Sequence, residues 1–345
     1  MSESLVGIVA NPASGKDIRR LVAHGSSFDN NEKINIVRRV LLGMDAVGTE
    51  RVAYMPDTYA IVERAASSIT LRLRLEPLSM PMVGIASDST EAAQRLADLG
   101  AGCIVTLGGD GTNRVVAKGS GNVPLVPIST GTNNAFPTMI EGTLAGLAAG
   151  LVATGNAANG PEEPAVVSRH PMLRVAVDGV DRDIALVDVV LSAQSWVGSR
   201  AIWDPAKVRA VVLSRVSKAD IGLASLGSSL APGASDHGAG IAVQLAHRAD
   251  DVATTVIAPV APGLVLPVRV ARWQLLQPGE SVALPAEGGT VALDGEREFR
   301  LGQGDRSVEV RLDPEGPFVV DVPAAIRAGA LAGALTVASA PPLAV

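Results

Sequence analysis

Short apolar runs alternate with helical patterns over the first 157 residues, and this alternation constrains the fold more than any other feature. Five runs have the length of strands: Leu5 to Ala10, Arg51 to Met55, Met82 to Ala86, Gly102 to Leu107 and Pro124 to Ile128. After the first run, one apolar stripe repeats at helical spacing, formed by Ile34, Val37, Val40, Leu41 and Met44. We therefore expect an α/β domain over residues 1–157, built on a doubly wound parallel sheet.

The rest of the chain favours a second, β-rich domain. Gly155 to Pro164 combines Gly, Asn, Pro and acidic residues, which is typical of a linker, so this domain is predicted over residues 164–322. Asp178-Gly179 and Asp294-Gly295 supply the positive φ angles of type I′ hairpin turns. Five further strands are expected at Gly240 to Leu245, Leu264 to Val270, Ser281 to Leu284, Ser307 to Leu312 and Phe318 to Val322.

Three expectations complete the second half. The first hairpin should pair Leu173 to Val177 with Ile184 to Leu191. A helix is expected near Asp204 to Val216, within the otherwise β-rich region. Residues 323–345 begin with a proline suited to the first turn of a helix, so we predict a C-terminal helix that packs back on the first domain.

Charge and composition exclude several classes of function. The chain has 29 Lys and Arg against 35 Asp and Glu, a net charge of -6, and no polybasic run, so neither nucleic acid nor a membrane is an expected partner. Cys103 is the only cysteine and the four histidines are scattered, which argues against a disulfide or a zinc cluster. Two long uncharged stretches contain prolines or many small residues, and no signal peptide is recognised, so we expect a cytoplasmic protein.

The strongest functional signal is the sequence Gly108-Gly109-Asp110-Gly111-Thr112 between a predicted strand and a predicted helix. Glycines let the backbone approach phosphate, and the amides at a helix start carry partial positive charge. An Asp beside phosphates is repelled unless it binds Mg²⁺ indirectly or takes a proton from an attacking hydroxyl. By itself this pentapeptide is equally compatible with a glycine turn whose Asp caps a helix.

Two further loops favour the functional interpretation. Asn11 to Lys16 follows the first predicted strand, and Ser129 to Asn134 follows the fifth. In a parallel sheet, loops that leave the carboxyl ends of strands meet at one edge, which is where doubly wound folds bind ligands. Other phosphate motifs do not fit, since a P-loop would need Gly and Ser or Thr where Ala10 and Asp17 stand, and no dinucleotide fingerprint follows the first strand.

These residues resemble the NAD kinase and diacylglycerol kinase superfamily. Its elements occur here in order, as N-P-x-S-G at Asn11 to Gly15, G-G-D-G-T at Gly108 to Thr112, T-G-T-N-N at Thr130 to Asn134 and D-G-E at Asp294 to Glu296. Within the superfamily the chain most resembles the acetoin catabolism protein X group, over Asp17 to Ala23, Asn31 to Lys33, Met55 to Asp57, Ala201 to Pro205 and Ile221 to Leu223.

The resemblance implies an NAD kinase-like homo-oligomer that uses ATP, or polyphosphate, with Mg²⁺ to phosphorylate a hydroxyl. Asp110 would be the catalytic base. The implied nucleotide- and phosphate-binding residues are Asn11, Ser14, Gly15, Gly108, Gly109, Gly111, Thr112, Thr130, Gly131, Thr132, Asn133 and Asn134. Asp188, Asp294 and Glu296 are implied substrate-binding or secondary acid/base residues.

The acceptor stays open at this point. NAD kinases carry an Asn-Glu or Asn-Asp pair where this chain has Val187-Asp188, so the amide is absent although Asp188 can still bind a ribose hydroxyl. NAD is the first acceptor to test, and a small hydroxylated catabolic metabolite is the second. A lipid kinase ranks third, since the chain has no basic amphipathic helix, and a nucleotide-binding regulator without turnover is the rival from another class.

Some charged residues keep two interpretations. Arg19, Arg20 and Lys33 either hold phosphate from the side or lie on a solvated helix face. Asp88, with Glu91 three residues later, is predicted to cap a helix.

Overall fold

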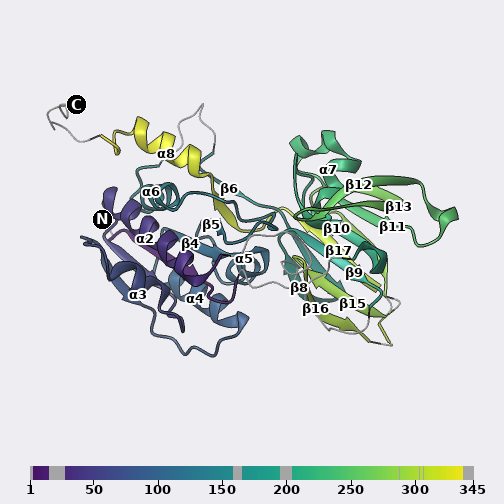
Figure 1. The fold of residues 1–345 in the computed structure, drawn as a ribbon, viewed down its shortest axis with the longest axis horizontal. Helices are drawn as coiled ribbons and strands as arrows, with labels where there is room; N and C mark the ends of the chain where they lie inside the picture. The colour runs from purple at the N-terminus through teal and green to yellow at the C-terminus, as the bar shows by residue number, and fades with distance from the viewer. Residues whose placement is uncertain are drawn as a thin grey trace.

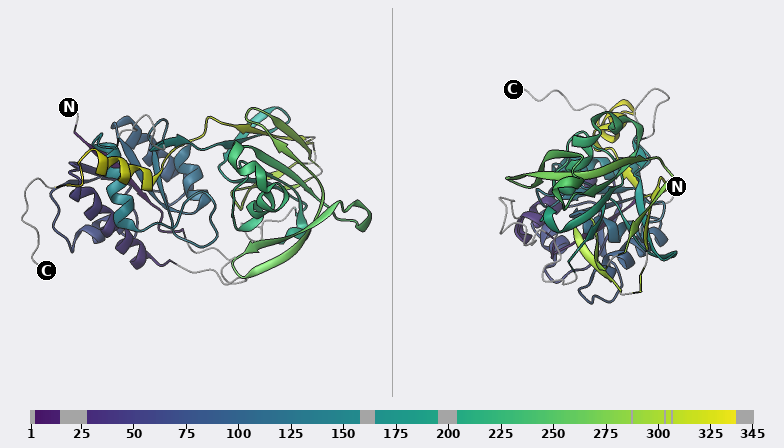
Figure 2. Two further views of the ribbon diagram at one scale, coloured as in Figure 1. Left: turned by 90° about the horizontal axis from the view of Figure 1, so that it is seen from above. Right: turned by 90° about the vertical axis from the view of Figure 1, so that its right-hand side faces the viewer.

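Figure 1 shows two lobes that the chain crosses more than once, with the N-terminal lobe in purple and blue and the second lobe in green. This computed structural model describes residues 3–14, 28–157, 165–194, 204–286, 288–302, 304–305 and 307–336. The C-terminal helix and one nearby strand, in yellow, lie on the N-terminal lobe (Figures 1 and 2). The last part of the chain therefore returns to the first lobe.

A seven-stranded sheet forms the centre of the N-terminal lobe. Its strands are β1 (Leu5–Ala10), β2 (Arg51–Tyr54), β3 (Arg74–Pro77), β4 (Cys103–Gly108), β5 (Leu125–Ser129), β6 (Val167–Arg169) and β18 (Phe318–Val320). They lie in the order β3-β2-β1-β4-β5-β18-β6, and every neighbouring pair is parallel except β18 with β6. The connection changes direction between β1 and β4, so their carboxyl ends flank the crevice where such sheets bind ligands.

Helices cover both faces of this sheet, as a doubly wound fold requires. The helices are α2 (Asn30–Ala46), α3 (Ile61–Ala66), α4 (Ala86–Asp98), α5 (Asp110–Ala117), α6 (Gly142–Ala153) and α8 (Val322–Leu331). The predicted stripe of α2 is buried in one core with α3, α6 and α8, and α4 and α5 contribute to a separate core with the opposite faces of β1 and β2. The predicted fold class of this lobe is confirmed.

The second lobe contains two antiparallel sheets. One has the order β12-β13-β11-β10-β9-β15-β16 and the other the order β14-β17-β7-β8. The strands are β7 (Met172–Val177), β8 (Val180–Ala185), β9 (Asp188–Ser192), β10 (Val208–Leu213), β11 (Gly240–Leu245), β12 (Thr254–Ala261), β13 (Leu264–Leu276), β14 (Ser281–Pro285), β15 (Gly289–Leu293), β16 (Glu296–Leu301) and β17 (Ser307–Asp313). A shared core lies between the sheets, and α7 (Ser225–Leu230) packs on the other face of the larger one.

Both predicted hairpin turns are confirmed. Asp178 and Gly179 have φ of 48° and 79°, and Asp294 and Gly295 have φ of 52° and 77°. The turns connect β7 to β8 and β15 to β16, whose registers pair the residues on either side of each Asp-Gly. The second strand of the first hairpin ends at Ala185, and the chain then crosses to the larger sheet as β9, so the expected single strand over Ile184 to Leu191 is wrong.

Two other predicted elements are wrong. Met82 to Ala86 is not a strand: Val83 and Ile85 are exposed, and helix α4 begins at Ala86, with Asp88 accepting hydrogen bonds from the amides before it. The expected helix near Asp204 to Val216 is a short 3-10 turn, Pro205–Lys207, followed by strand β10. β10 lies between β9 and β11 with its apolar residues buried, an environment that favours its β-branched valines as a strand.

The C-terminal helix is confirmed as α8, with Asp321 as its N-cap and a proline in its first turn. It packs on α6. The predicted domain boundaries stay predictions, and part of the proposed linker, residues 158–164, lies outside the described residues. Among the helices of the described ranges, none has the length and apolar character needed to cross a membrane.

Candidate active site

Three loops meet at the carboxyl ends of β1, β4 and β5, as their positions after parallel strands predict. The Asn11 side chain, after β1, donates through Nδ2 to Thr112 Oγ1 on α5 at 2.9 Å. The hydroxyls of Ser14 and Thr130, the latter after β5, are 3.1 Å apart. These contacts join residues more than 100 positions apart in the sequence into one surface. The predicted convergence of the loops is confirmed.

The two glycines before Asp110 allow this close packing. A Cβ at Gly108 would lie 2.4 Å from the side chain of Thr112, and one at Gly109 would lie 2.8 Å from Asn134 Oδ1. Asn134 is itself held by a 2.7 Å hydrogen bond from Nδ2 to Ser129 Oγ. A side chain at Gly108 would thus collide with Thr112 of the same turn, and one at Gly109 with Asn134 of the loop after β5, whatever ligand binds beside them.

Asp110 is the first residue of helix α5, and its carboxylate is held by backbone amides. It accepts hydrogen bonds from Ala135 N at 3.1 Å and from Phe136 N at 2.8 Å. Further along the helix, the buried Asn113 accepts a 2.5 Å hydrogen bond from Thr106 of β4. The strand, the turn and the helix are thus fixed to one another, and the orientation of the Asp110 carboxylate is fixed with them.

Lys33 is completely buried, and its side chain contacts the backbone of the loop after β1. Its ammonium group donates to the carbonyl oxygens of Asn11 at 2.9 Å, Pro12 at 3.2 Å and Ser14 at 2.7 Å. The solvated-face interpretation is therefore wrong for Lys33. The signal that identifies it is its position four residues before Val37, on the apolar stripe of α2, where a charged residue needs buried partners.

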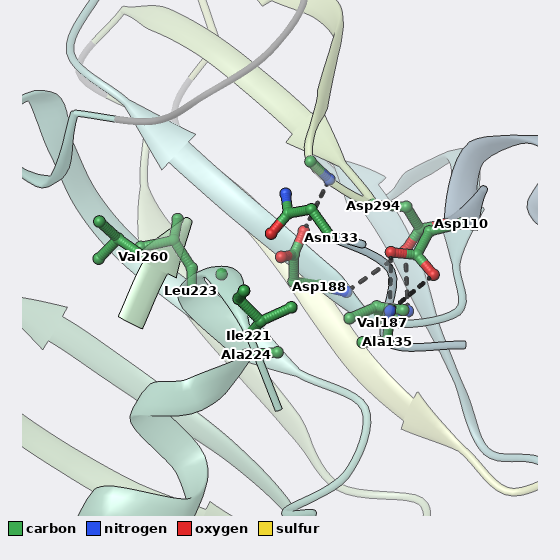
Figure 3. Close-up of a pocket in the computed structure, with 12 residues that line it drawn as sticks. Asp110, Asn133, Ala135, Val187, Asp188, Ile221, Leu223, Ala224, Val260 and Asp294 are labelled. Atoms are coloured by element: carbon green, nitrogen blue, oxygen red, sulfur yellow. Dashed lines mark hydrogen bonds between the residues drawn. The ribbon is translucent and has the colours of Figure 1, made fainter. Parts of the chain in front are cut away.

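A pocket opens between the two lobes beside Asp110 (Figure 3). One side is polar and carries Asp110, Asn133 and Asp188. The other is apolar and carries Ile221, Leu223 and Val260. Asn133 Oδ1 is buried and has no hydrogen-bond partner among the described residues. The pocket therefore offers carboxylates and an amide oxygen opposite a hydrocarbon surface.

The predicted D-G-E element forms the turn that closes this pocket. The backbone amide of Asp294 donates to Asp188 O at 2.9 Å, and that of Gly295 donates to Asp188 Oδ1 at 3.1 Å. Glu296 follows at the start of β16, and its carboxylate carbon lies 3.6 Å from the position of a Cβ on Gly111. The last predicted motif thus lies against the central one, although they come from different lobes.

Asp294 itself is fully buried and turned inward. Its carboxylate accepts hydrogen bonds from the amides of Leu186 at 3.0 Å and Val187 at 2.8 Å. The pKa of Asp294 is raised to about 7, because the effect of burial, to which the neighbouring Asp110 adds, outweighs the lowering effect of Arg114. Asp294 is therefore a titrating group next to the candidate base.

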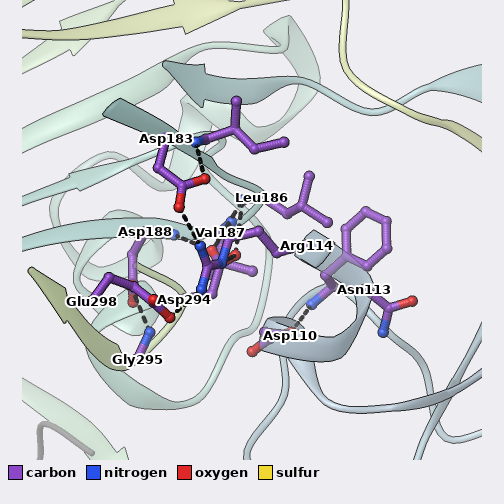
Figure 4. Close-up of polar contacts among 12 residues, drawn as sticks. Asp110, Asn113, Arg114, Asp183, Leu186, Val187, Asp188, Asp294, Gly295 and Glu298 are labelled. Carbon is purple, nitrogen blue, oxygen red and sulfur yellow. Dashed lines mark hydrogen bonds and ion pairs between the residues drawn. The ribbon is translucent and has the colours of Figure 1, made fainter. Parts of the chain in front are cut away.

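Arg114, a residue that sequence reasoning missed, connects the two lobes through ion pairs (Figure 4). Its guanidinium lies 3.0 Å from Asp183 on β8 and 3.5 Å from Asp294, and it pairs with Glu298 on β16. Only 3% of its side chain is exposed. The sequence feature that could have identified Arg114 is helical spacing. It lies four residues after Asp110 and therefore projects from the same face of α5.

The remaining predicted residues have these positions. The Gly131 carbonyl oxygen accepts from Ser129 and Asn134, and Thr130 is buried, so this part of the loop is bonded largely within itself. Gly15, Arg19 and Arg20 lie outside the described residues. Thr132 lies between the buried part of this loop and the pocket residue Asn133.

Two family models match successive parts of the chain. The model of the ATP-NAD kinase N-terminal domain matches residues 6–156. The model of the acetoin catabolism protein X C-terminal domain matches residues 171–315. The chain is 39% identical over 333 residues to acetoin catabolism protein X of Cupriavidus necator, which covers 94% of this chain and 91% of that protein.

Solved structures with a similar arrangement have little sequence identity to the chain. A protein from Bacillus anthracis str. Sterne, assigned as a diacylglycerol kinase, is 13% identical with a TM-score of 0.48, covering 93% of this chain and 98% of that one. An NAD kinase from Archaeoglobus fulgidus in complex with ATP is 14% identical with a TM-score of 0.39, covering 96% and 98%.

Proposed function

Because this chain belongs to the acetoin catabolism protein X family and has an NAD kinase-like fold, we propose that it is an ATP-dependent kinase that phosphorylates a hydroxyl of a small molecule. Transfer forms a bond from the acceptor oxygen to the γ-phosphorus and breaks the bond to the leaving ADP. The products are ADP and a phosphate monoester. We expect the enzyme to act as a cytoplasmic homo-oligomer.

The observation that carries this proposal is the placement of Asp110. Asp110 is the first residue of helix α5, at the point where the three loops meet. Its carboxylate is oriented by two backbone amides and borders the pocket between the lobes. A base must lie within hydrogen-bonding reach of the proton that it removes. In our proposal the acceptor occupies this pocket, and its hydroxyl loses its proton to Asp110 as it attacks.

The nucleotide is proposed to bind on the other side of Asp110, over the three loops. The first turn of α5 has backbone N–H groups without intrahelical partners, and the helix dipole adds positive potential there. The loop residues Asn11, Ser14, Thr112 and Thr130 lie beside it. Asp188 and Asn133 supply oxygen donors of the kind that Mg²⁺ prefers, so they fit a cation that enters with ATP, while Asp110 stays available to the acceptor proton. Such a cation would neutralise charge on the phosphates.

NAD is the first acceptor in this proposal. The N-terminal half matches the ATP-NAD kinase model, and Asp188 offers a carboxylate to a ribose hydroxyl from the pocket wall. The second candidate is a small hydroxylated metabolite with alkyl groups. The observation that favours it is the apolar side formed by Ile221, Leu223 and Val260, together with Val187 at the position where NAD kinases carry an amide.

A transfer assay with radiolabelled ATP and Mg²⁺ tests the proposal. Purified protein is incubated with NAD, NADH, short diols and hydroxyketones, and products are separated by chromatography. Labelled NADP would support the first acceptor, and a labelled phosphate ester of a diol or hydroxyketone the second. Binding of ATP with no transfer to any acceptor would overturn the kinase proposal and favour a nucleotide-binding regulator.

A further inference from the structure

A cluster of charged side chains, of which Arg114 and Asp294 are buried, joins the lobes next to Asp110. Arg114 contacts three carboxylates, those of Asp183, Asp294 and Glu298. Lys118, one turn further along α5, pairs with Asp183 at 2.5 Å. Helix α5 and its C-cap thus supply the candidate base and two cations, and the second lobe supplies the carboxylates. Figure 4 shows Asp110, Arg114 and the carboxylates around the guanidinium. The formal charges are uneven, with two cations against three carboxylates before Asp110 is counted.

The cluster fixes the turn that completes the pocket. Asp294 accepts hydrogen bonds from the amides of Leu186 and Val187, and its carboxylate lies 3.5 Å from Arg114 Nε as an ion pair without a hydrogen bond. The next residue, Gly295, is bonded to Asp188, and Glu296 follows beside Gly111. A displacement of Asp294 would therefore carry the Glu296 side chain and the Asp188 contact with it.

We propose that Arg114 is a positioning residue that fixes the Asp294-Gly295-Glu296 turn against Asp110 and so aligns the acceptor pocket with the site of phosphoryl transfer. This inference rests on the proposed function, which it deepens by assigning the connection between the two halves of the site. Arg114 acts through Asp294 and touches neither nucleotide nor acceptor in this proposal.

An arginine suits this role because its planar guanidinium can contact several carboxylates in different directions. A lysine side chain is shorter and carries its charge on one compact ammonium group. Arg114→Lys therefore keeps the charge and loses the geometry. Arg114→Gln loses both.

The test compares wild type, both variants and the control Arg174→Lys, which alters an Arg-Asp pair with Asp313 away from the pocket. We expect kcat to fall about 10- to 100-fold in Arg114→Lys, since small misplacements at a reacting centre have effects of this size. Nucleotide affinity should change less than about threefold, because the nucleotide loops belong to the first lobe. The KM for the acceptor should rise in both variants while the nucleotide dissociation constant stays close to the wild-type value, a split that a general loss of folding would not cause.

Amide hydrogen exchange gives a readout that does not depend on turnover. Faster exchange at Leu186, Val187 and Gly295 in both Arg114 variants, and not in the control, would support the proposal. If wild type transfers phosphate but the variants keep wild-type kcat and exchange rates, the positioning role is overturned. Equal losses of kcat and nucleotide affinity would also overturn it. If wild type transfers to no acceptor, the proposed function fails, and unchanged exchange would then separately reject the role of Arg114.

Discussion

The two sides of the candidate site are held together by different physical means. On the nucleotide side, loops of one sheet contact one another through neutral hydrogen bonds, such as Asn11 to Thr112, and through glycines that admit no side chain. On the acceptor side, the turn at Asp294 comes from another lobe, and its buried carboxylate makes an ion pair with Arg114 and accepts from the amides of Leu186 and Val187. One side depends on close packing, and the other depends on charge balance.

This difference indicates how each side should respond to perturbation. Packed glycine contacts do not titrate and leave little room for adjustment. The buried carboxylate of Asp294 titrates, and the loss of a charged partner leaves the remaining charge uncompensated. Asp110 belongs to both sides, because its carboxylate is held by amides of the loop after β5 and lies beside Asp294.

The largest effect is expected at this shared residue. Asp110→Asn removes the proposed base but keeps an oxygen that can accept from the amide of Phe136. We expect kcat to fall about 1,000-fold, within the range found for general bases, while the nucleotide dissociation constant changes less than about threefold. Steady-state assays and nucleotide titration measure the two quantities. Unchanged turnover would contradict the assignment of Asp110, and lost nucleotide binding would show that it belongs mainly to the packed side.

The convergence of the three loops was predictable from the sequence for a physical reason. Its residues follow strands whose apolar runs are visible, and parallel strands bring their carboxyl ends together without further information. Cys103 to Leu107 and the glycines after it illustrate this, since strand, turn and helix are adjacent in the chain. Asp29 likewise caps α2 through Glu32 N, a local contact that local sequence can specify.

The acceptor side was less predictable because its contacts are long-range. Arg114 meets Glu298 across 184 positions, and no local pattern identifies that partner. The apolar wall at Ile221 and Val260 forms only when the second lobe is folded. The same reason explains β10, whose valines are compatible with helix or strand until their neighbours β9 and β11 are known.

A second variant tests whether the packed side also depends on a charge. Lys33→Met removes a buried ammonium that holds three carbonyl oxygens of the first loop. Each acceptor that loses its donor costs about 1 to 3 kcal/mol. At the lower end of this range the three acceptors together lower the free energy of unfolding by about 3 kcal/mol. Nucleotide affinity should fall about tenfold because the loop loses its support.

Urea denaturation and nucleotide titration measure these effects. Lys207→Met, which alters a half-exposed lysine paired with Asp204, is the matched control and should change stability by less than about 0.5 kcal/mol. Wild-type stability in Lys33→Met would show that the loop holds its conformation without this charge.

A third variant tests the packing of the scaffold beneath the loops. Helices α2 and α6 approach so closely that a Cβ on Gly146 would lie 2.1 Å from the carbonyl oxygen of Val40. We expect Gly146→Ala to lower the free energy of unfolding by about 2 kcal/mol, because overpacking outweighs the better helix propensity of Ala. Gly233→Ala is the control, since a Cβ there meets nothing within 4 Å. Equal stabilities of the two variants would show that α2 and α6 can move apart without cost.

The smallest effect is expected when the pH changes by half a unit. Two buried groups, His170 and Asp294, change the stability with pH in opposite directions. Burial and the charge of Arg215 lower the pKa of His170 to about 3, from an ordinary value of 6.5. The folded state therefore binds fewer protons than the unfolded state between these values, and His170 makes stability rise with pH in that window. Burial raises the pKa of Asp294 from 3.8 to about 7, so Asp294 makes stability fall as pH rises between those values.

Between about pH 4 and 6.5 the two contributions oppose each other, each with a limit of about 1.4 kcal/mol per pH unit. The free energy of unfolding of His170→Asn should therefore fall with rising pH more steeply than that of wild type. The free energy of unfolding of Asp294→Asn should instead rise with pH relative to wild type. Urea midpoints measured at half-unit steps of pH give both slopes, and the double variant should return close to the wild-type slope. If Asp294→Asn leaves the slope unchanged, Arg114 already holds Asp294 ionised throughout this range, and the acceptor side is as insensitive to pH as the packed side.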